Sequence, residues 1–210
     1  MSVRDRYRQS WPRIGALGAM ALSGSLVVTH KKLSKPQLFA ALNFLALLVH
    51  QYEEYEYPGY FPGQFNAGVL HSDEPDHYPL NPDIAMIINT VIGYPAYILP
   101  VAFPKKRWIG LAPVLFGFTQ AVAHGLIINR LGKARYSPGF LASFFLHVPI
   151  GIAYIQALRA EGPIDHADWL KARVCAFALG AGGLAAPNLL LRDKNSPYAF
   201  TAKQLGRYAR

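Results

Sequence analysis

The sequence predicts an all-α fold, a polytopic helix bundle embedded in a membrane. Hydrophobic residues make up 52% of the chain and charged residues only 16%, which is well below the roughly 25% typical of a soluble domain. The apolar residues gather into six runs, and a helix needs about 20 such residues to cross a bilayer. Because the chain has 210 residues, we expect a single integral membrane domain, 1–210.

The distribution of charge predicts the same class. No Lys or Arg occurs between Pro36 and Pro104, whereas seven of the twelve acidic residues fall inside that stretch. The basic residues flank the apolar runs, as they do in multi-spanning membrane proteins. Loops beside anionic headgroups of the lipid bilayer therefore explain the net charge of +9. No nucleic-acid partner is expected, because the sequence has no basic stripe with interleaved aromatic residues.

About six transmembrane segments are expected. The first run follows an arginine-rich start and is short, so it is expected as a retained short span or half-span rather than a cleaved signal peptide. The other five runs reach the length of a full span. The predicted segments are 14–29, 37–56, 84–103, 108–131, 139–158 and 171–191.

Two polar segments connect or follow these spans. Residues 57–83 form a long acidic loop without Lys or Arg, and long loops of this kind are often functional. We interpret it as a possible lid over a site. Residues 192–210 form a basic tail that is expected at the surface. The single cysteine, Cys175, excludes a disulfide framework and a cysteine-based metal site.

The most informative feature is a polar insert at the end of the second run. His50 is followed three and four positions later by Glu53 and Glu54, and on a helix these spacings bring side chains onto adjacent parts of one face. Ionisable side chains at the edge of a membrane span are costly and need partners. The insert therefore predicts a functional site.

Two histidines of other spans are predicted to reach the same depth. At 1.5 Å of rise per residue, His124 lies roughly 10 Å and His147 roughly 12 Å inside the membrane face at which the second span ends. Imidazole and carboxylate ligands suit zinc, iron or manganese. We therefore predict a divalent metal, zinc or iron, bound by His50, Glu54, His124 and His147. Glu53 and Glu54 are the predicted catalytic carboxylates; a metal-free acid/base pair or a structural polar network is the alternative.

Further candidates surround this cluster. His71, in the acidic loop, is a possible additional metal ligand. The predicted substrate-binding residues are polar groups near the ends of the same spans, and arginines among them could hold an anionic headgroup or serve as interface anchors. They are Asn66, Asn129, Arg130, Arg135 and Tyr136.

The ordered set of motifs resembles a bacterial and archaeal membrane protein family named for its HXXEE motif. The likeness covers roughly residues 38–158 and rests on His50 to Glu54, Pro58-Gly59, Phe65-Asn66, Ala123-His124, Tyr136 to Gly139 and His147. The resemblance implies an integral membrane protein with a polar site at His50, Glu53, Glu54, His124 and His147. It implies no substrate.

Three functions follow as hypotheses. The leading one is a membrane-embedded, metal-dependent enzyme, a hydrolase acting on a lipid or other apolar small substrate. The alternatives are a di-iron oxidoreductase and a non-enzymatic carrier or lipid- or cation-binding protein. The side that carries both termini has slightly more Lys and Arg. That bias places this side, and the site near it, at the cytoplasmic face of a bacterial inner membrane.

Overall fold

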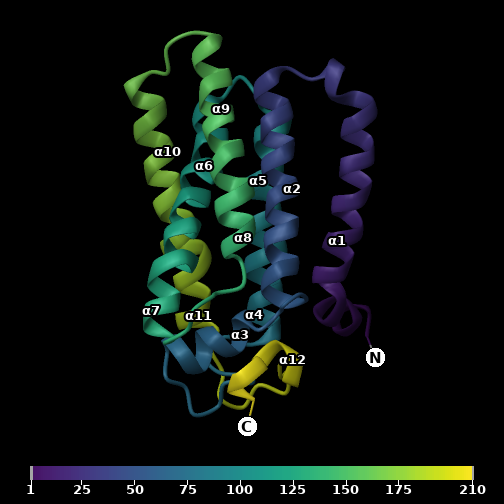
Figure 1. Cartoon of the computed structure of the whole chain (residues 1–210), viewed down its shortest axis with the longest axis vertical. Coiled ribbons are helices and arrows are strands. Elements are labelled where there is room, and N and C mark those ends of the chain that lie inside the picture. The colour runs from purple at the N-terminus through teal and green to yellow at the C-terminus, as the bar shows by residue number, and fades with distance from the viewer. Residues whose placement is uncertain (1, 210) are drawn as a thin grey trace.

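The computed structural model describes residues 2–209, and within them the chain forms helices and no strands (Figure 1). Six long helical segments stand roughly side by side. The first two are α1 (Val3–Thr29) and α2 (Lys35–Tyr55). The other four are α4 (Pro82–Met86) with η3 (Ile87–Gly93) and α5 (Tyr94–Ala102); α6 (Arg107–Val122) with η4 (Ala123–Ile127) and α7 (Ile128–Leu131); α8 (Phe140–Ala142) with η5 (Ser143–His147) and α9 (Val148–Ala160); and α10 (His166–Ala178) with η6 (Leu179–Ala185) and α11 (Ala186–Leu190).

Five of these segments are long and apolar enough to cross a membrane: Val3–Lys32, Pro82–Ala102, Arg107–Leu131, Phe140–Ala160 and His166–Leu190. The predicted polytopic bundle is thereby confirmed, and the protein is an integral membrane protein. α2 falls outside the five because its last turns carry His50, Gln51 and the two glutamates. These polar side chains are nevertheless buried, because α2 packs against α1, α5 and α9.

The first span is longer than expected. The predicted apolar run at 14–29 is part of a longer helix, because α1 begins at Val3 and runs through the arginine-rich start. A capping box explains the early beginning: the Ser2 side chain accepts from the Asp5 N–H, and the Asp5 carboxylate accepts from the Ser2 N–H. The 3₁₀ turn η1 (His30–Lys32) then leads to a second capping box, between Ser34 and Gln37, that starts α2.

The acidic loop contains helical turns of its own, α3 (Phe61–Gly63) and the π-helical η2 (Gln64–Val69). Asn66 holds the loop together, because its side chain donates to the carbonyls of Pro75 and Leu80 and accepts from the Leu80 N–H. The basic tail, expected at the surface, is partly buried. It forms α12 (Ala202–Leu205) and η7 (Gly206–Tyr208), and it packs Phe200 and Leu205 into a core with Trp11, Tyr55 and Ile84.

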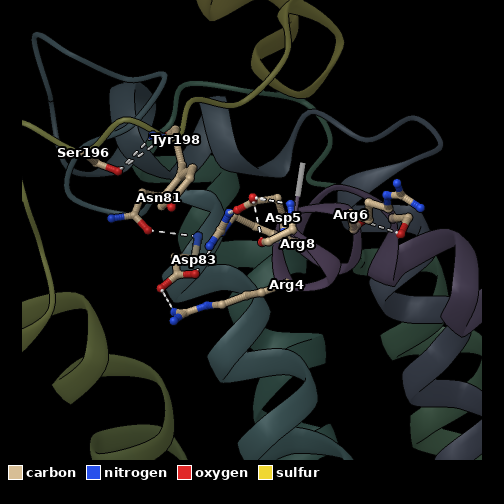
Figure 2. A network of polar contacts seen from close by, with 10 residues as sticks. Arg4, Asp5, Arg6, Arg8, Asn81, Asp83, Ser196 and Tyr198 are labelled. Atoms are coloured by element: carbon tan, nitrogen blue, oxygen red, sulfur yellow. Dashed lines mark hydrogen bonds and ion pairs between the residues drawn. The ribbon is translucent and has the colours of Figure 1, made fainter.

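Both termini lie at the end of the bundle where α2 finishes (Figure 1). There a buried arginine, Arg8, joins α1 to the start of α4 (Figure 2). Its guanidinium donates to Asp5 at 2.7 Å and to Asp83 at 2.9 Å, and it stacks 3.5 Å from the ring centre of Tyr198 in the tail. Asp83 also accepts from Arg4 at 2.7 Å. One cation thus ties the first span, the third span and the tail together.

Replacing Arg8 by alanine is expected to destabilise this end of the protein. The substitution removes two charged hydrogen bonds and leaves Asp83 paired with Arg4 within the described residues. Hydrogen bonds to charged groups contribute roughly 1.5–3 kcal/mol, and the partly exposed partners reduce the expected loss to about 1–3 kcal/mol. Thermal unfolding in detergent measures it.

The matched control is Arg6→Ala, because Arg6 is an exposed arginine two positions earlier on the same helix. Exposed substitutions usually change stability by less than about 0.5 kcal/mol. Equal unfolding midpoints for the two variants would contradict the role given to Arg8.

Candidate metal centre

Three buried side chains meet near the C-terminal end of α2. His50 and Glu54 lie one turn apart on α2, and His124 reaches them from η4. Glu54 Oε1 is 3.4 Å from His50 Nε2 and 3.4 Å from His124 Nε2. A tetrahedral ion with bonds of about 2.0–2.1 Å holds its ligand atoms roughly 3.3 Å apart. The three residues form a group that could hold a metal ion, so this part of the predicted ligand set comes together.

Hydrogen bonds to the outer nitrogen of each ring orient these histidines. Ser143 Oγ donates its proton to the Gly139 carbonyl at 2.7 Å, so it can only accept from His50 Nδ1, 3.0 Å away. His50 Nδ1 therefore carries the proton, and in the neutral ring Nε2 presents a lone pair to Glu54. His124 also has a hydrogen-bond partner at its outer nitrogen, because Nδ1 lies 3.1 Å from Ser137 Oγ. Partners of this kind fix the tautomer of metal-binding histidines.

The electrostatics of the cluster call for a bound metal ion or an additional proton. A neutral His50 directs a lone pair, not a proton, at the carboxylate of Glu54, and this arrangement is repulsive. A buried anion without a compensating positive charge is strongly unfavourable. A metal ion, a proton that converts one ring to an imidazolium, or a proton on Glu54 itself relieves this repulsion. The nearly equal distances from Glu54 Oε1 to the two Nε2 atoms suit a metal ion lying between all three.

His147, the fourth predicted ligand, lies beside this group and outside it. Its ring centre is 5.8 Å from that of His50, and it lines the same cavity. Nδ1 of His147 donates to Asn43 Oδ1 at 2.7 Å, so Nε2 of the neutral ring keeps a free lone pair. The arrangement suits a proton acceptor next to the cluster as well as it suits a further ligand.

Glu53 has surroundings very different from those of Glu54. Its carboxylate accepts from the backbone N–H groups of Leu141 at 3.1 Å and Ala142 at 2.8 Å, and from the hydroxyl of Tyr136. The two amides belong to the first turn of α8, so Glu53 caps the fifth span from a neighbouring helix. Burial and the bond to Glu53 both raise the pKa of Tyr136 well above its ordinary value, which keeps this hydroxyl a donor.

The turn before α8 brings the backbone close to both imidazole rings. Gly139 has φ +101°, and a Cβ there would lie 2.8 Å from His124 Cε1 and 3.0 Å from His50 Cε1. Any side chain would therefore be strained and would collide with the site. The Tyr136–Gly139 motif thus supplies the Tyr136 and Ser137 contacts and the close approach that Gly139 allows.

π-helical turns interrupt four of the spans at the level of the site: η3, η4, η5 and η6. Three of them end two residues before a proline, at Pro95, Pro149 and Pro187. Proline lacks an N–H and clashes with the carbonyl four residues earlier, and a widened turn accommodates this defect. Such turns are frequent at functional sites, and here they carry His124 and His147.

A cavity of about 330 Å³ lies against the cluster. His50, Glu54, His124 and His147 contribute to its wall, whereas most of the other lining side chains are apolar, from η3, α6 and η6. Phe61 and Phe65 of the acidic loop close one end. Two buried amide oxygens at the cavity, Gln51 Oε1 and Asn188 Oδ1, have no hydrogen-bond partner among residues 2–209.

The other predicted site residues lie elsewhere. His71 is exposed and lines a separate cavity between the acidic loop and the tail. Asn66 holds the loop, as described above, and Asn129 donates to the Gly125 carbonyl. Arg130 and Arg135 are exposed at the end of the bundle. Only Tyr136 of the predicted substrate-binding group touches a residue of the motif.

Four buried polar residues of the site had not been singled out from the sequence: Asn43, Gln51, Ser137 and Ser143. Three of them orient the histidines. Asn43 sits seven residues before His50 on α2 and so shares its helical face, which is the one signal that could have identified it.

A family model described as a protein of unknown function with an HXXEE motif matches residues 41–154, more than half of the chain. The chain belongs to this family. The match confirms the resemblance inferred from His50, Glu53 and Glu54, and it includes His124, His147 and Asn43. Within the HXXEE motif, the structure gives the two glutamates different environments. Comparisons with curated proteins and with solved structures found no match.

Glu53→Gln is expected to destabilise the protein without removing any of the three clustered side chains. The amide keeps one acceptor, but its NH₂ group would face a backbone donor of α8, which costs about 1–3 kcal/mol. Thermal unfolding in detergent tests this. Glu161→Gln is the control, because Glu161 is exposed at the end of α9; equal stability of the two variants would argue against the capping role.

Proposed function

We propose that the protein is a membrane-embedded, metal-dependent enzyme, a hydrolase that acts on a lipid or other apolar substrate. The observation that carries the proposal is a buried cluster in which Glu54 Oε1 lies 3.4 Å from His50 Nε2 and 3.4 Å from His124 Nε2. Three protein ligands with an open position are typical of hydrolytic zinc sites. The apolar wall of the adjoining cavity favours an apolar substrate.

A single metal ion fits better than a di-iron centre. Di-iron sites in helix bundles use four carboxylates and two histidines. The group of potential ligands in the described residues contains one carboxylate, that of Glu54. Glu53 is engaged by three donors. We therefore favour zinc or iron bound singly over the di-iron oxidoreductase.

In the proposed hydrolysis, His147 and a bound metal have different roles. A bound metal would supply Lewis-acid polarisation of the scissile carbonyl. His147 Nε2, oriented through Nδ1 by Asn43, accepts a proton from the attacking water. The water oxygen forms a bond to the carbonyl carbon, the bond to the leaving oxygen breaks, and His147 returns the proton to that oxygen. Glu53 does not take part, because it holds the fifth span in place.

The site is placed toward the cytoplasm in this proposal. The end of the bundle that carries both termini also carries the C-terminal turns of α2 (Figure 1). The small excess of Lys and Arg at that end supports a cytoplasmic position in a bacterial inner membrane.

Metal analysis of the detergent-purified protein tests the core of the proposal. We expect about one zinc or iron per chain in the wild type and at least a tenfold loss in Glu54→Gln and His124→Ala, because each variant removes one of three ligands. His166→Ala, a histidine at the far start of α10, should keep its metal, as should Glu53→Gln. Absence of stoichiometric metal in the wild type would refute the proposal.

The role of His147 has a separate test. With a long-chain p-nitrophenyl ester as probe, chelator-sensitive hydrolysis is expected in the wild type. His147→Ala should lower kcat by about 10²–10⁴ while keeping the metal, which is the usual effect of losing a general base. His166→Ala is again the control. If chelation or His147→Ala leaves hydrolysis unchanged, the proposed chemistry is wrong. Full metal without turnover of any ester would favour a cation-binding carrier.

A further inference from the structure

A second cavity, the lateral groove, adjoins the one at the metal cluster. It has a volume of about 440 Å³ and lies between α5, α6 and α10, with Leu99, Trp108 and Cys175 among its lining residues. It shares four lining residues with the cavity at the cluster: Ile92, Ala96, Leu179 and Gly183. These four residues therefore form the boundary between the two cavities.

The helix that borders both cavities faces the membrane. In the last span, His166–Leu190, only 11% of the most apolar window is buried inside the protein. Its π-helical turn η6 contains Gly180, Gly182 and Gly183, and a Cβ on Gly180 or Gly182 would meet nothing within 4 Å. A Cβ on Gly183 would lie 3.3 Å from Ile92 Cγ2 of η3. At Gly183, η6 therefore packs closely against Ile92 of η3 and has no side chain of its own at that point.

The wall of the cavity at the cluster contains hydrogen-bond acceptors without partners. Gln51, a residue of the cavity wall, is 1% exposed and donates from Nε2 to the Asn89 carbonyl, whereas its buried Oε1 has no partner among the described residues. Asn188 lines the same cavity, and its buried Oδ1 also has no hydrogen-bond partner among the described residues. A buried acceptor left unpaired costs free energy, so the cavity calls for a ligand with hydrogen-bond donors. Because a cation is expected at the cluster, a hydroxyl donor suits the site better than an ammonium group.

We propose that the substrate is a single-chain lipid with a hydroxylated headgroup, which enters from the bilayer between η3 and η6. Its hydroxyl group donates to Gln51 Oε1 beside the cluster, and its alkyl chain passes Gly183 and lies in the lateral groove. The inference rests on the proposed function, because it assigns a substrate class to the same cavity. Its binding test nevertheless needs no metal and no turnover.

The lone cysteine is a convenient reporter of the lateral groove. Cys175 lines it and is partly buried, and it lies eight residues before Gly183, or roughly 12 Å along the helix. A long-chain 1-alkanol should therefore protect Cys175 from N-ethylmaleimide in lipid nanodiscs. A short-chain 1-alkanol that fills only the cavity at the cluster should not. The methyl ether of the long-chain alcohol, which lacks the donor, should need about five- to tenfold higher concentration.

Two variants test the path and the headgroup contact. Gly183→Val should raise the half-protecting concentration of the long-chain alcohol at least tenfold, because the new side chain would press against Ile92 and block the boundary between the two cavities. Ala181→Leu adds the same number of carbons at an exposed position of η6 and should behave as the wild type. Gln51→Leu should abolish the preference for the alcohol over its ether.

The outcomes separate this inference from the proposed function. Equal protection by short and long chains, an unchanged Gly183→Val variant, or equal potency of alcohol and ether each overturns the inference. Those results leave metal content and chelator-sensitive hydrolysis untouched. Conversely, chain-length-dependent protection in a protein without bound metal would support the lipid path while refuting the metal-dependent enzyme.

Discussion

The structure depends on one electrostatic constraint, a buried carboxylate oxygen that faces two imidazole nitrogens at 3.4 Å. In a low-dielectric interior the charge of Glu54 must be compensated. Because Ser143 leaves the proton of a neutral His50 on the far nitrogen, the ring cannot provide compensation as a neutral donor. The cluster therefore needs a metal ion or an additional proton, and the surrounding helices hold the three groups at a spacing that suits one ion.

The two glutamates of the HXXEE motif have different surroundings because adjacent residues of a helix point in different directions. Successive side chains are about 100° apart around the axis. Glu54 thus faces the cavity with His50, which lies one turn earlier, while Glu53 faces the fifth span and caps the first turn of α8. The cap fixes the position of the fifth span relative to α2, and that span brings Ser143 and His147 to the site. Glu53 thus holds the helices that form the site, and Glu54 faces into the site.

Much of this arrangement could be predicted from the sequence, because hydropathy and helical rise depend only on position along the chain. Hydropathy located the spans, and the constant rise of a helix placed His50, His124 and His147 at one depth. The same reasoning could not separate Glu53 from Glu54, because their roles depend on which neighbouring helix each one faces. It also missed the start of α1, where a capping box extends the helix through charged residues.

The residues that orient the histidine rings could not be identified from the sequence, for a different reason. Asn43, Ser137 and Ser143 are ordinary polar residues in sequence, and only their contacts with ring nitrogens give them meaning. Prolines two residues after η3, η5 and η6 did carry a usable signal. They read as helix breaks in the sequence, whereas in the structure widened turns accommodate them while the spans remain continuous.

The proposed hydrolase would need water and an apolar substrate to reach one point, and two further cavities adjoin the cavity at the cluster. The lateral groove shares Ile92, Ala96, Leu179 and Gly183 with it. A polar cavity of about 650 Å³ between the acidic loop and the tail shares Phe65, Ala185 and Asn188 with the cavity at the cluster. It contains His71, Glu74 and Lys194, groups that hold water rather than lipid. His71, expected as a ligand, thus lines this charged cavity, and in the proposed reaction the cavity would be the route for water while the lateral groove takes the alkyl chain.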